Sequence, residues 1–335
     1  MLISDLTEAE IIARIQSRLQ PPPDWLLVGI GDDAAVVEPE RNRLEVLTVD
    51  ALVEGIHFDR RFTPPDAIGH RALAVNLSDL AAMGAEPRLA LLSLALPGGL
   101  ACADFDAMIA GLAALAAAHR LHVIGGNLTE SPGPLVLDVM VAGTVKPRQA
   151  LLRRGARPGD AVYVTGTVGS AAAGLEMLKS STTEVTDTLR GHVSLCVRRY
   201  LYPEPRVRTG LLLARNRAAT ACMDLSDGLA DGARQIAAAS GVGMRIDAAA
   251  LPIEDEARRW FDAHGGDAST SAITGGDDYE LMFTVRPNRT GRLAAALRNG
   301  GGPITKVGVC TEGPDVTLVV GARDTPMPRG YGHFR

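Results

Sequence analysis

Hydrophobic residues recur along the chain in blocks whose period changes between helical and extended. The segment "EAEIIARIQ" has helical spacing and follows Thr7, which forms a T-x-x-E capping box with Glu10. A helix is therefore expected to begin there. Residues 43–53, "RLEVLTVDALV", alternate between apolar and polar positions and are rich in β-branched side chains. This period of two predicts a strand that ends near Asp50.

The next elements alternate in type. Residues 66–85 predict a helix capped by Asp66, and residues from about 104 to 119 predict an Ala-rich helix. The apolar run "ALLSLALP" between them predicts a buried strand. A strand "LHVIGG", a turn "NLTESPGP" and a strand "LVLDVMVAGTV" follow. The first half therefore predicts a mixed sheet with helices.

The second half restarts this alternation after a basic, turn-rich segment at residues 146–160. It contains the strand "AVYVTG", the helix "SAAAGLEMLK" and the strand-turn-helix "ATACMDLSDGLADGARQIAAA". A glycine turn then leads into a strand within "ITGGDDYELMFTV". The pattern predicts an α/β (α+β) protein with two domains, residues 1–148 and residues 149–335.

Composition narrows the function classes. The 335 residues are 46% hydrophobic, and the formal net charge of -5 argues against a large nucleic-acid footprint. Acidic residues stand where a signal peptide would need a basic region, and no apolar run reaches the ~18 residues of a membrane helix. Four scattered cysteines suggest neither a disulfide framework nor a zinc site. A cytoplasmic protein with reduced thiols and no membrane partner is expected.

Carboxylates gather at the ends of predicted elements and within apolar runs. One such residue usually shapes a turn or caps a helix. Asp79 is harder to explain in this way, because it lies within a predicted apolar helix and Asn76 shares its face. A structural hydrogen bond remains an alternative for Asp79. The full set is Asp32, Asp33, Asp50, Asp79, Asp224, Asp227, Asp277, Asp278 and Glu280.

Converging carboxylates repel one another unless a cation lies between them. Mg²⁺ prefers oxygen ligands and retains water and phosphate ligands, so a Mg²⁺–nucleotide complex is the expected partner. The sequence contains neither G-x-x-x-x-G-K-[ST] nor an H-R-D catalytic loop. The glycine-rich "TGTVGSAAAG" lacks the lysine and is interpreted as a packing turn, whereas "GGN" and "LSDG" could offer amides to phosphate.

These motifs together resemble the aminoimidazole-ribonucleotide-synthetase-like superfamily and, within it, the thiamine-monophosphate kinase family. The resemblance extends over nearly the whole chain. It rests on "GIGDDAAVV", "TVDALVEGIHF", "ALAVNLSDLAAMGAEP", "IGGN", "RRGARPGD", "YVTGTVGSAAAGL", "MDLSDGL", "GGDDYEL" and "GYGHF". It implies an N-terminal mixed-sheet domain that binds ATP and Mg²⁺ and dimerises. A C-terminal α/β domain would complete the nucleotide and substrate site.

The resemblance also implies roles for individual residues. Several Mg²⁺ ions would be held by Asp33, Thr48, Asp50, Asp79, Asn127, Asp224 and Asp227. ATP would contact Gly126, Asn127, Arg153 and Ser226, and thiamine monophosphate would contact His57, Glu280 and Tyr331. Asn127 is the neutral choice at a position where the family has Asp or Asn. Arg154 could replace Arg153, and Asp32 is expected to shape the turn before Asp33.

The reaction implied is direct in-line transfer of a phosphoryl group from ATP to thiamine monophosphate, giving thiamine diphosphate and ADP. No catalytic residue is expected beyond those that position metal and phosphates. The alternatives are a related ATP-dependent synthetase, a selenophosphate-type or hydrogenase-maturation enzyme, and a catalytically silent nucleotide sensor. The first cysteine is Cys102 and the sequence ends in Arg335, so the cysteines expected of a selenophosphate-type enzyme and of a hydrogenase-maturation enzyme are absent. The intact acidic set argues against a silent sensor.

Overall fold

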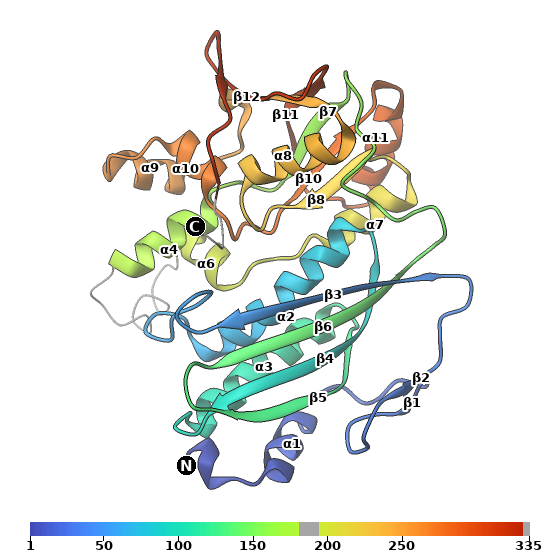
Figure 1. The fold of residues 1–335 in the computed structure, drawn as a ribbon, viewed down its shortest axis with the longest axis vertical. Helices are drawn as coiled ribbons and strands as arrows, with labels where there is room; N and C mark the ends of the chain where they lie inside the picture. Colours follow the sequence, from blue (N-terminus) through green and yellow to red (C-terminus); the bar gives the residue numbers. More distant parts are fainter. Residues whose placement is uncertain (181–193, 331–335) are drawn as a thin grey trace. The chain divides into compact units, whose positions relative to one another are not determined.

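The computed structural model describes residues 1–180 and 194–330. Contacts divide the chain into two compact units. Unit 1 comprises Met1–Leu77 and Glu86–Pro147, and unit 2 comprises Ser78–Ala85 and the residues from Arg148 onward. Both contain helices and β-sheet, which confirms the α/β (α+β) class (Figure 1). The predicted boundary between residues 148 and 149 leaves Ser78–Ala85 in the first domain, whereas the contacts assign this segment to unit 2.

Unit 1 is built on a four-stranded sheet in the order β3-β6-β4-β5. Strand β6 pairs antiparallel with both β3 and β4, whereas β4 and β5 are parallel. Its elements are η1 (Ile3–Asp5), α1 (Glu8–Gln16), β1 (Leu26–Val28), β2 (Val36–Val37), β3 (Leu44–Val53), the part of α2 (Pro65–Ala82) up to Leu77, β4 (Glu86–Pro97), α3 (Cys102–Ala118), β5 (His122–Ser131) and β6 (Val136–Val145). Helices α2 and α3 lie on one face of this sheet (Figure 1).

The alternation in β3 separates two environments. Leu47 and Val49 are 63% and 59% exposed, whereas Leu52 on the alternate face is buried. Successive side chains of a strand point to opposite faces, so Thr48 and Asp50 share the face of Leu52. The face of Leu47 and Val49 is covered only in part, where Trp25 and Leu26 pack against a small core cluster.

Unit 2 is built on a seven-stranded sheet in the order β13-β12-β9-β11-β7-β10-β8. Only the β12–β9 pair is parallel within the described residues. Its elements are β7 (Ala161–Thr165), α4 (Ser170–Ser180), α6 (Leu195–Leu201), α7 (Val207–Arg215), β8 (Ala221–Asp224), α8 (Leu229–Ser240), β9 (Gly243–Asp247), η2 (Ala248–Ala250), α9 (Asp255–Ala263), α10 (Ala268–Thr274), β10 (Leu281–Val285), η3 (Pro287–Arg289), α11 (Thr290–Arg298), β11 (Ile304–Thr311), β12 (Val316–Val320) and β13 (Arg323–Pro326).

The core of unit 2 joins this sheet to its helices. Met223, Met244 and Met282 from the strands pack with Ile236 of α8 and Phe261 of α9. The four cysteines of the chain are free and buried. Among the described helices, none combines the length and the apolar character needed to span a bilayer.

Two local predictions differ from the structure. The segment "NLTES" is not a turn, because β5 continues to Ser131 and pairs with β4 as far as Pro97. Its polar residues are tolerated because β5 is the edge strand of the sheet. Asp66 does not cap α2 from outside but lies in its first turn, one residue after Pro65. The capping box of Thr7 and Glu10 is confirmed.

Candidate functional site

Asp224 is the last residue of β8 and is only 4% exposed. Burial raises the pKa of its carboxyl to about 7, and the neighbouring carboxylate of Asp79 adds to this. The hydroxyl of Ser78 donates a hydrogen bond of 2.8 Å to Oδ2 of Asp224 and opposes the shift, as does the positive charge of Arg153. Unit 2 therefore brings Asp79 and Asp224 together as the sequence predicts.

This carboxylate pair has the chemistry of a divalent cation site. Like charges held close together in a dry setting disfavour ionisation, and a bound cation reverses that preference. The described residues contain no group of three or more His, Cys, Asp or Glu side chains placed to hold a metal ion. The pair in unit 2 is thus a partial ligand set.

The loop after β8 is packed against the loop before β10. The carbonyl of Ser226 accepts a hydrogen bond of 2.8 Å from the amide of Asp277. Gly228 has φ +91°, and a Cβ at this position would lie 2.5 Å from the carbonyl oxygen of Gly275. Only glycine fits both constraints. The two motifs "LSDG" and "GGDD" therefore hold Ser226 and Asp227 at the end of β8.

The glycine-rich turn before α4 is used internally. Oδ2 of Asp278 accepts a hydrogen bond of 2.6 Å from the amide of Gly169, and Oδ1 accepts one of 3.2 Å from Ala171. Burial raises the pKa of Asp278 to about 8, and these amides oppose the rise. Because two of its amides already bind a side chain, this turn serves packing rather than phosphate.

Glu280 is 1% exposed and occupies a strong internal network. Arg206 donates from Nε to Oε2 of Glu280 over 2.6 Å, and its Nη2 donates to Oε1. The hydroxyl of Thr165 donates to Oε2 over 2.5 Å and accepts from the amide of Leu281. The carboxylate predicted to contact substrate is thus already bound by a bidentate arginine.

Arg153 lies on the surface, where its Nη1 donates to Oε1 of Gln235 in α8. Its charge also acts on Asp224, as described above. Arg154 is exposed as well. The charge of Arg153 therefore favours the ionised form of Asp224.

In unit 1 the predicted ligands do not all come together. Strand β3 carries Thr48 and Asp50 at one edge of the sheet, and β5 carries Asn127 at the other edge. Three strand spacings separate these edges, about 14 Å. Register pairs Asn127 with Ser93, Ser93 with Asp138, and Asp138 with Ala51 of β3. Asn127 therefore shares the face of Ala51 and not that of Asp50, so one chain does not bring it to the ion held by Asp50.

Asp33 is exposed in the turn between β1 and β2. The backbone amide of Asp33 donates a hydrogen bond of 2.9 Å to Oδ1 of Asp32. Asp32 thus shapes the turn that presents Asp33. His57 follows β3, and its Nδ1 accepts a hydrogen bond of 3.0 Å from the amide of Val53. An accepting Nδ1 places the proton of a neutral ring on Nε2.

Gly126 is exposed on β5, and a Cβ there would lie 1.8 Å from the carbonyl oxygen of Leu92. This position therefore accepts only glycine.

Tyr331 lies outside the described residues. The last described residue, Gly330, reaches the loop after β8, because a Cβ there would lie 3.1 Å from the carbonyl oxygen of Asp227. Three residues before Gly330, the carbonyl oxygen of Met327 accepts a hydrogen bond of 2.6 Å from Nη2 of Arg234 in α8.

Sequence reasoning missed three residues that support these side chains. Ser78 precedes Asp79 in "NLSDL", Thr165 ends β7, and Arg206 lies in the segment just before α7. A buried carboxylate requires a partner, and the apolar run "LMFTV" directly after Glu280 is the one sequence signal that points to such burial. The sequence contains 34 Lys and Arg residues, and nothing in their spacing identifies Arg206.

Comparison with known proteins places these features in a family. Residues 31–145 match the AIR synthase related protein N-terminal domain, and residues 157–321 match the C-terminal domain. The thiamine-monophosphate kinase of Salmonella typhimurium is 39% identical, over 98% of this chain and 98% of its own. The structure of thiamine-monophosphate kinase from Stenotrophomonas maltophilia is 38% identical with a TM-score of 0.79, over 94% of this chain and 96% of its own.

A further similar structure is AaThiL complexed with AMPPCP and TMP. It is 31% identical with a TM-score of 0.76, and the match covers 100% of this chain and 99% of that one. Identity above 30% over nearly complete chains, together with the matches to both domains, establishes the family of this chain. The chain belongs to the thiamine-monophosphate kinase family, within the AIR synthase related proteins.

Proposed function

We propose that this protein transfers the γ-phosphoryl group of ATP to the phosphate of thiamine monophosphate and releases thiamine diphosphate and ADP. The observation that carries the proposal is membership of the family over nearly the full chain length. A structure of one similar protein is complexed with AMPPCP and TMP, which is the expected pair of an ATP analogue and the acceptor. The proposed class is therefore a phosphotransferase with a phosphate acceptor.

The proposed phosphoryl transfer requires that the two phosphates be positioned, and it does not require a general base. A phosphate acceptor is already an anion at neutral pH, so no side chain has to remove a proton from it. The transfer needs the acceptor and the γ-phosphate held in line and their mutual repulsion reduced. A site rich in aspartate and poor in lysine and histidine suits this demand. We assign no catalytic residue beyond those that position metal and phosphates.

The residues of the site fit Mg²⁺. Carboxylate and hydroxyl oxygens are the ligands it prefers, and the raised pKa of Asp224 beside Asp79 indicates a place where a cation is favourable. When bound, Mg²⁺ supplies positive charge that offsets the charge of the phosphates. The ligands we propose are Asp33, Thr48, Asp50 and Asn127 of unit 1, and Asp79, Asp224 and Asp227 of unit 2.

ATP and substrate contacts follow the same reasoning. For ATP we propose Gly126, Asn127, Arg153 and Ser226. Gly126 supports a close approach, because no side chain hinders the exposed backbone of β5 there. For thiamine monophosphate we propose His57, Glu280 and Tyr331.

Glu280 needs a more specific role. Its carboxylate is buried and bound by Arg206, so it is not an open counterion for the thiazolium. We propose that it acts on substrate through the loop it anchors. Its backbone carbonyl accepts the amide of Leu225 over 2.8 Å, next to Asp224. A loss of the Arg206–Glu280 pair would thus disturb both the loop and the metal ligands.

We propose that the protein forms a homodimer through unit 1. The support is the face of its sheet that carries Leu47 and Val49, which are 63% and 59% exposed. Exposed apolar side chains that gather on one sheet face mark an interaction surface. A second copy is the occupant that the family resemblance implies. We assign the reaction to the cytoplasm, which suits four cysteines that are free and buried.

The direct test is ADP release from ATP and Mg²⁺ with thiamine monophosphate, beside free thiamine as the control acceptor. We expect turnover with the monophosphate only, because free thiamine lacks the anionic acceptor. Absence of turnover over a range of Mg²⁺ concentrations, with ATP binding retained, would instead support a silent nucleotide sensor. For the tail, Tyr331→Ala is expected to raise the KM for thiamine monophosphate more than the KM for ATP. Equal rises would remove Tyr331 from the substrate site.

A further inference from the structure

Two segments of unit 2 concentrate positive charge. Residues 206–219 and 286–303 hold eight arginines and no aspartate or glutamate, although the formal net charge of the chain is -5. The segments form α7, η3 and α11, and helices α7 and α11 pack against each other. Nη1 of Arg292 lies 3.5 Å from the carbonyl oxygen of Arg217, which ties the two segments together. The fold thus joins two basic segments that are far apart in sequence.

Few of these charges are neutralised internally. Arg206 pairs with Glu280, and Nε of Arg286 lies 3.5 Å from Oδ1 of Asp160. Within the described chain the other six make no ion pair, namely Arg208, Arg215, Arg217, Arg289, Arg292 and Arg298. Burial lowers the pKa of Arg289 and the charges of Arg286 and Arg292 lower it further, whereas the charge of Asp160 opposes the shift. A bound polyanion would relieve this repulsion.

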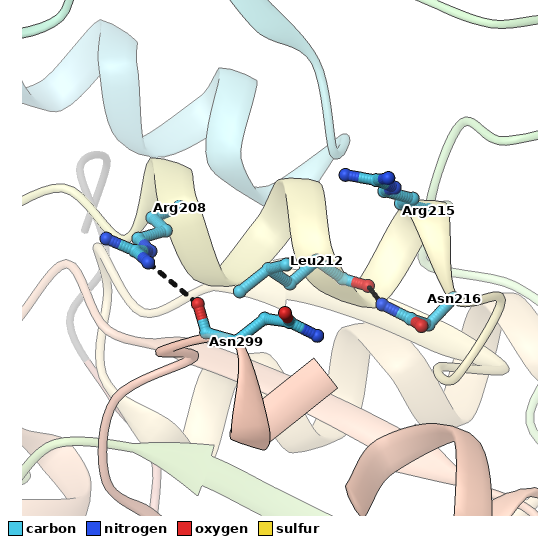
Figure 2. A pocket seen from close by; sticks show the side chains of 5 residues that line it. All are labelled: Arg208, Leu212, Arg215, Asn216 and Asn299. Carbon is cyan, nitrogen blue, oxygen red and sulfur yellow. Dashed lines mark hydrogen bonds between the residues drawn. The ribbon is translucent and has the colours of Figure 1, made fainter. Parts of the chain in front are cut away.

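A cavity of about 370 Å³ opens on this basic surface (Figure 2). It is lined by Arg208, Leu212, Arg215, Asn216 and Asn299. Its volume lies in the usual range for small-ligand sites, about 300–1,000 Å³. Figure 2 shows the two arginines toward opposite ends of α7, with Leu212 between them. The cavity therefore offers positive charge at both ends and an apolar side chain in the middle.

The spacing of the two arginines suits an elongated ligand. Arg208 and Arg215 are seven residues apart on α7, so they share a helix face and lie about 10 Å apart along the axis. Nη2 of Arg208 donates to the carbonyl of Asn299 over 2.7 Å, which fixes its guanidinium at the rim. The guanidinium of Arg215 donates to no described residue, so its N–H groups remain open to a ligand.

Helix stability alone does not explain Arg208. It lies in the first turn of α7, which contains no acidic residue, and Arg206 at the N-cap provides no side-chain cap. A positive charge there opposes the helix dipole at a cost of about 0.3–1 kcal/mol. A bound anion would turn this unfavourable arrangement into a favourable one, since the same helix end and the arginine would both attract it.

We propose that this cavity is a second ligand site that binds a linear polyphosphate. Guanidinium groups bind phosphate oxygens in bidentate fashion, and two arginines whose backbone positions lie about 10 Å apart along α7 suit a chain of phosphates better than a single one. None of the lining residues belongs to the set proposed for ATP, thiamine monophosphate or Mg²⁺. Arginines need no metal to bind phosphate, whereas carboxylates do. The site is thus independent of the proposed kinase function and is expected to work without Mg²⁺.

The test is isothermal titration calorimetry of the full chain in EDTA at low ionic strength. Tripolyphosphate is the probe, and orthophosphate is the comparison. We expect tripolyphosphate to bind at least about tenfold more tightly than orthophosphate, because it reaches both arginines. The double variant Arg208→Gln with Arg215→Gln is expected to lose at least about tenfold in affinity. The matched control, Arg258→Gln with Arg259→Gln in the exposed part of α9, removes the same charge and is expected to bind as the wild type does.

A further arm separates two sources of the polyphosphate. ATP in EDTA is expected to bind if the ligand is the tail of a nucleotide, and to bind much more weakly than tripolyphosphate if the ligand is inorganic. The proposal is overturned if the wild type does not bind tripolyphosphate, or if both double variants lose affinity equally, since only net charge would then matter. Tighter binding of a short oligonucleotide than of tripolyphosphate would make the surface a nucleic-acid site and would also overturn it.

Folding of the variants is checked by circular dichroism and thermal unfolding. Should the double variant misfold, Arg215→Gln alone decides the question. Its guanidinium donates no hydrogen bond to described residues, so the substitution leaves the fold intact. We expect about a three- to tenfold loss of affinity for tripolyphosphate. Unchanged affinity of this single variant would refute the site.

Discussion

Asp224→Asn tests whether the ionised carboxylate of Asp224 destabilises the folded chain when no cation is bound beside it. Burial and the neighbouring Asp79 raise the pKa of Asp224 from 3.8 to about 7. Between these two values the folded chain binds more protons than the unfolded chain. Stability therefore falls as the pH rises through this window. Asparagine has nearly the same shape but carries no charge, so the variant escapes this loss.

The magnitude follows from the shift. One pKa unit corresponds to about 1.4 kcal/mol, so the raised pKa lowers the free energy of unfolding by about 4 kcal/mol at pH 8 and by about 2 kcal/mol at pH 5, relative to a pH at which the carboxyl is protonated in both states. Asp224→Asn is thus expected to be more stable than the wild type in EDTA, with an advantage that grows between pH 5 and pH 8. The hydroxyl of Ser78, 2.8 Å from Oδ2, can donate to the amide oxygen instead.

The assay is urea unfolding at pH 5 and pH 8, in EDTA and again with Mg²⁺. Mg²⁺ is expected to stabilise the wild type at pH 8 and to have little effect on Asp224→Asn, because ligand binding to the folded state adds to its stability. Asp262→Asn in the exposed part of α9 is the matched control and is expected to change little at either pH. An advantage that stays constant from pH 5 to pH 8, or equal stabilisation by Mg²⁺, would refute this account of the pair.

Three further predictions concern the rest of the proposed site. Asp50→Asn is expected to abolish ADP release and leave the circular dichroism spectrum unchanged; retained kcat at limiting Mg²⁺ would contradict its metal role. Arg206→Gln leaves the carboxylate of Glu280 buried without its cation and is expected to lower the free energy of unfolding by about 3 kcal/mol in urea titration. A loss below about 1 kcal/mol would show that water solvates this carboxylate. Leu47→Glu with Val49→Glu is expected to convert the dimer to a monomer in light scattering; a monomeric wild type would remove the dimer proposal.

Much of the fold follows from local pattern. The alternation in residues 43–53 predicts β3 together with its two faces, and the box of Thr7 and Glu10 predicts the start of α1. Asp79 within an apolar helix and Asp224 at the end of an apolar strand can both be recognised as acidic motifs from their neighbours in the sequence. Such features depend on a few consecutive residues, so a single sequence contains the signal.

Other features of the site depend on the order of the strands in a sheet and on which strands pair. Asn127 and Asp50 both resemble metal ligands, yet strand order places them at opposite edges of one sheet. The strand that begins with "LHVIGG" extends to Ser131 because the backbone of the following "NLTES" pairs with β4. The side chains of "NLTES" are themselves typical of a turn. Hydrogen bonding between backbones is insensitive to side chains, and sequence patterns are blind to it for that reason.

By itself, the sequence determined the α/β (α+β) class, the types of the strongly periodic elements and the acidic motifs that mark the family. Only the tertiary structure decided that Arg206 neutralises Glu280, that Asp278 occupies the glycine turn before α4, and that two basic segments join in one surface. The physical reason is the range of the forces involved. Periodicity and capping act over one or two turns of chain, whereas the partner of a buried charge is selected by three-dimensional proximity and by the cost of leaving that charge alone.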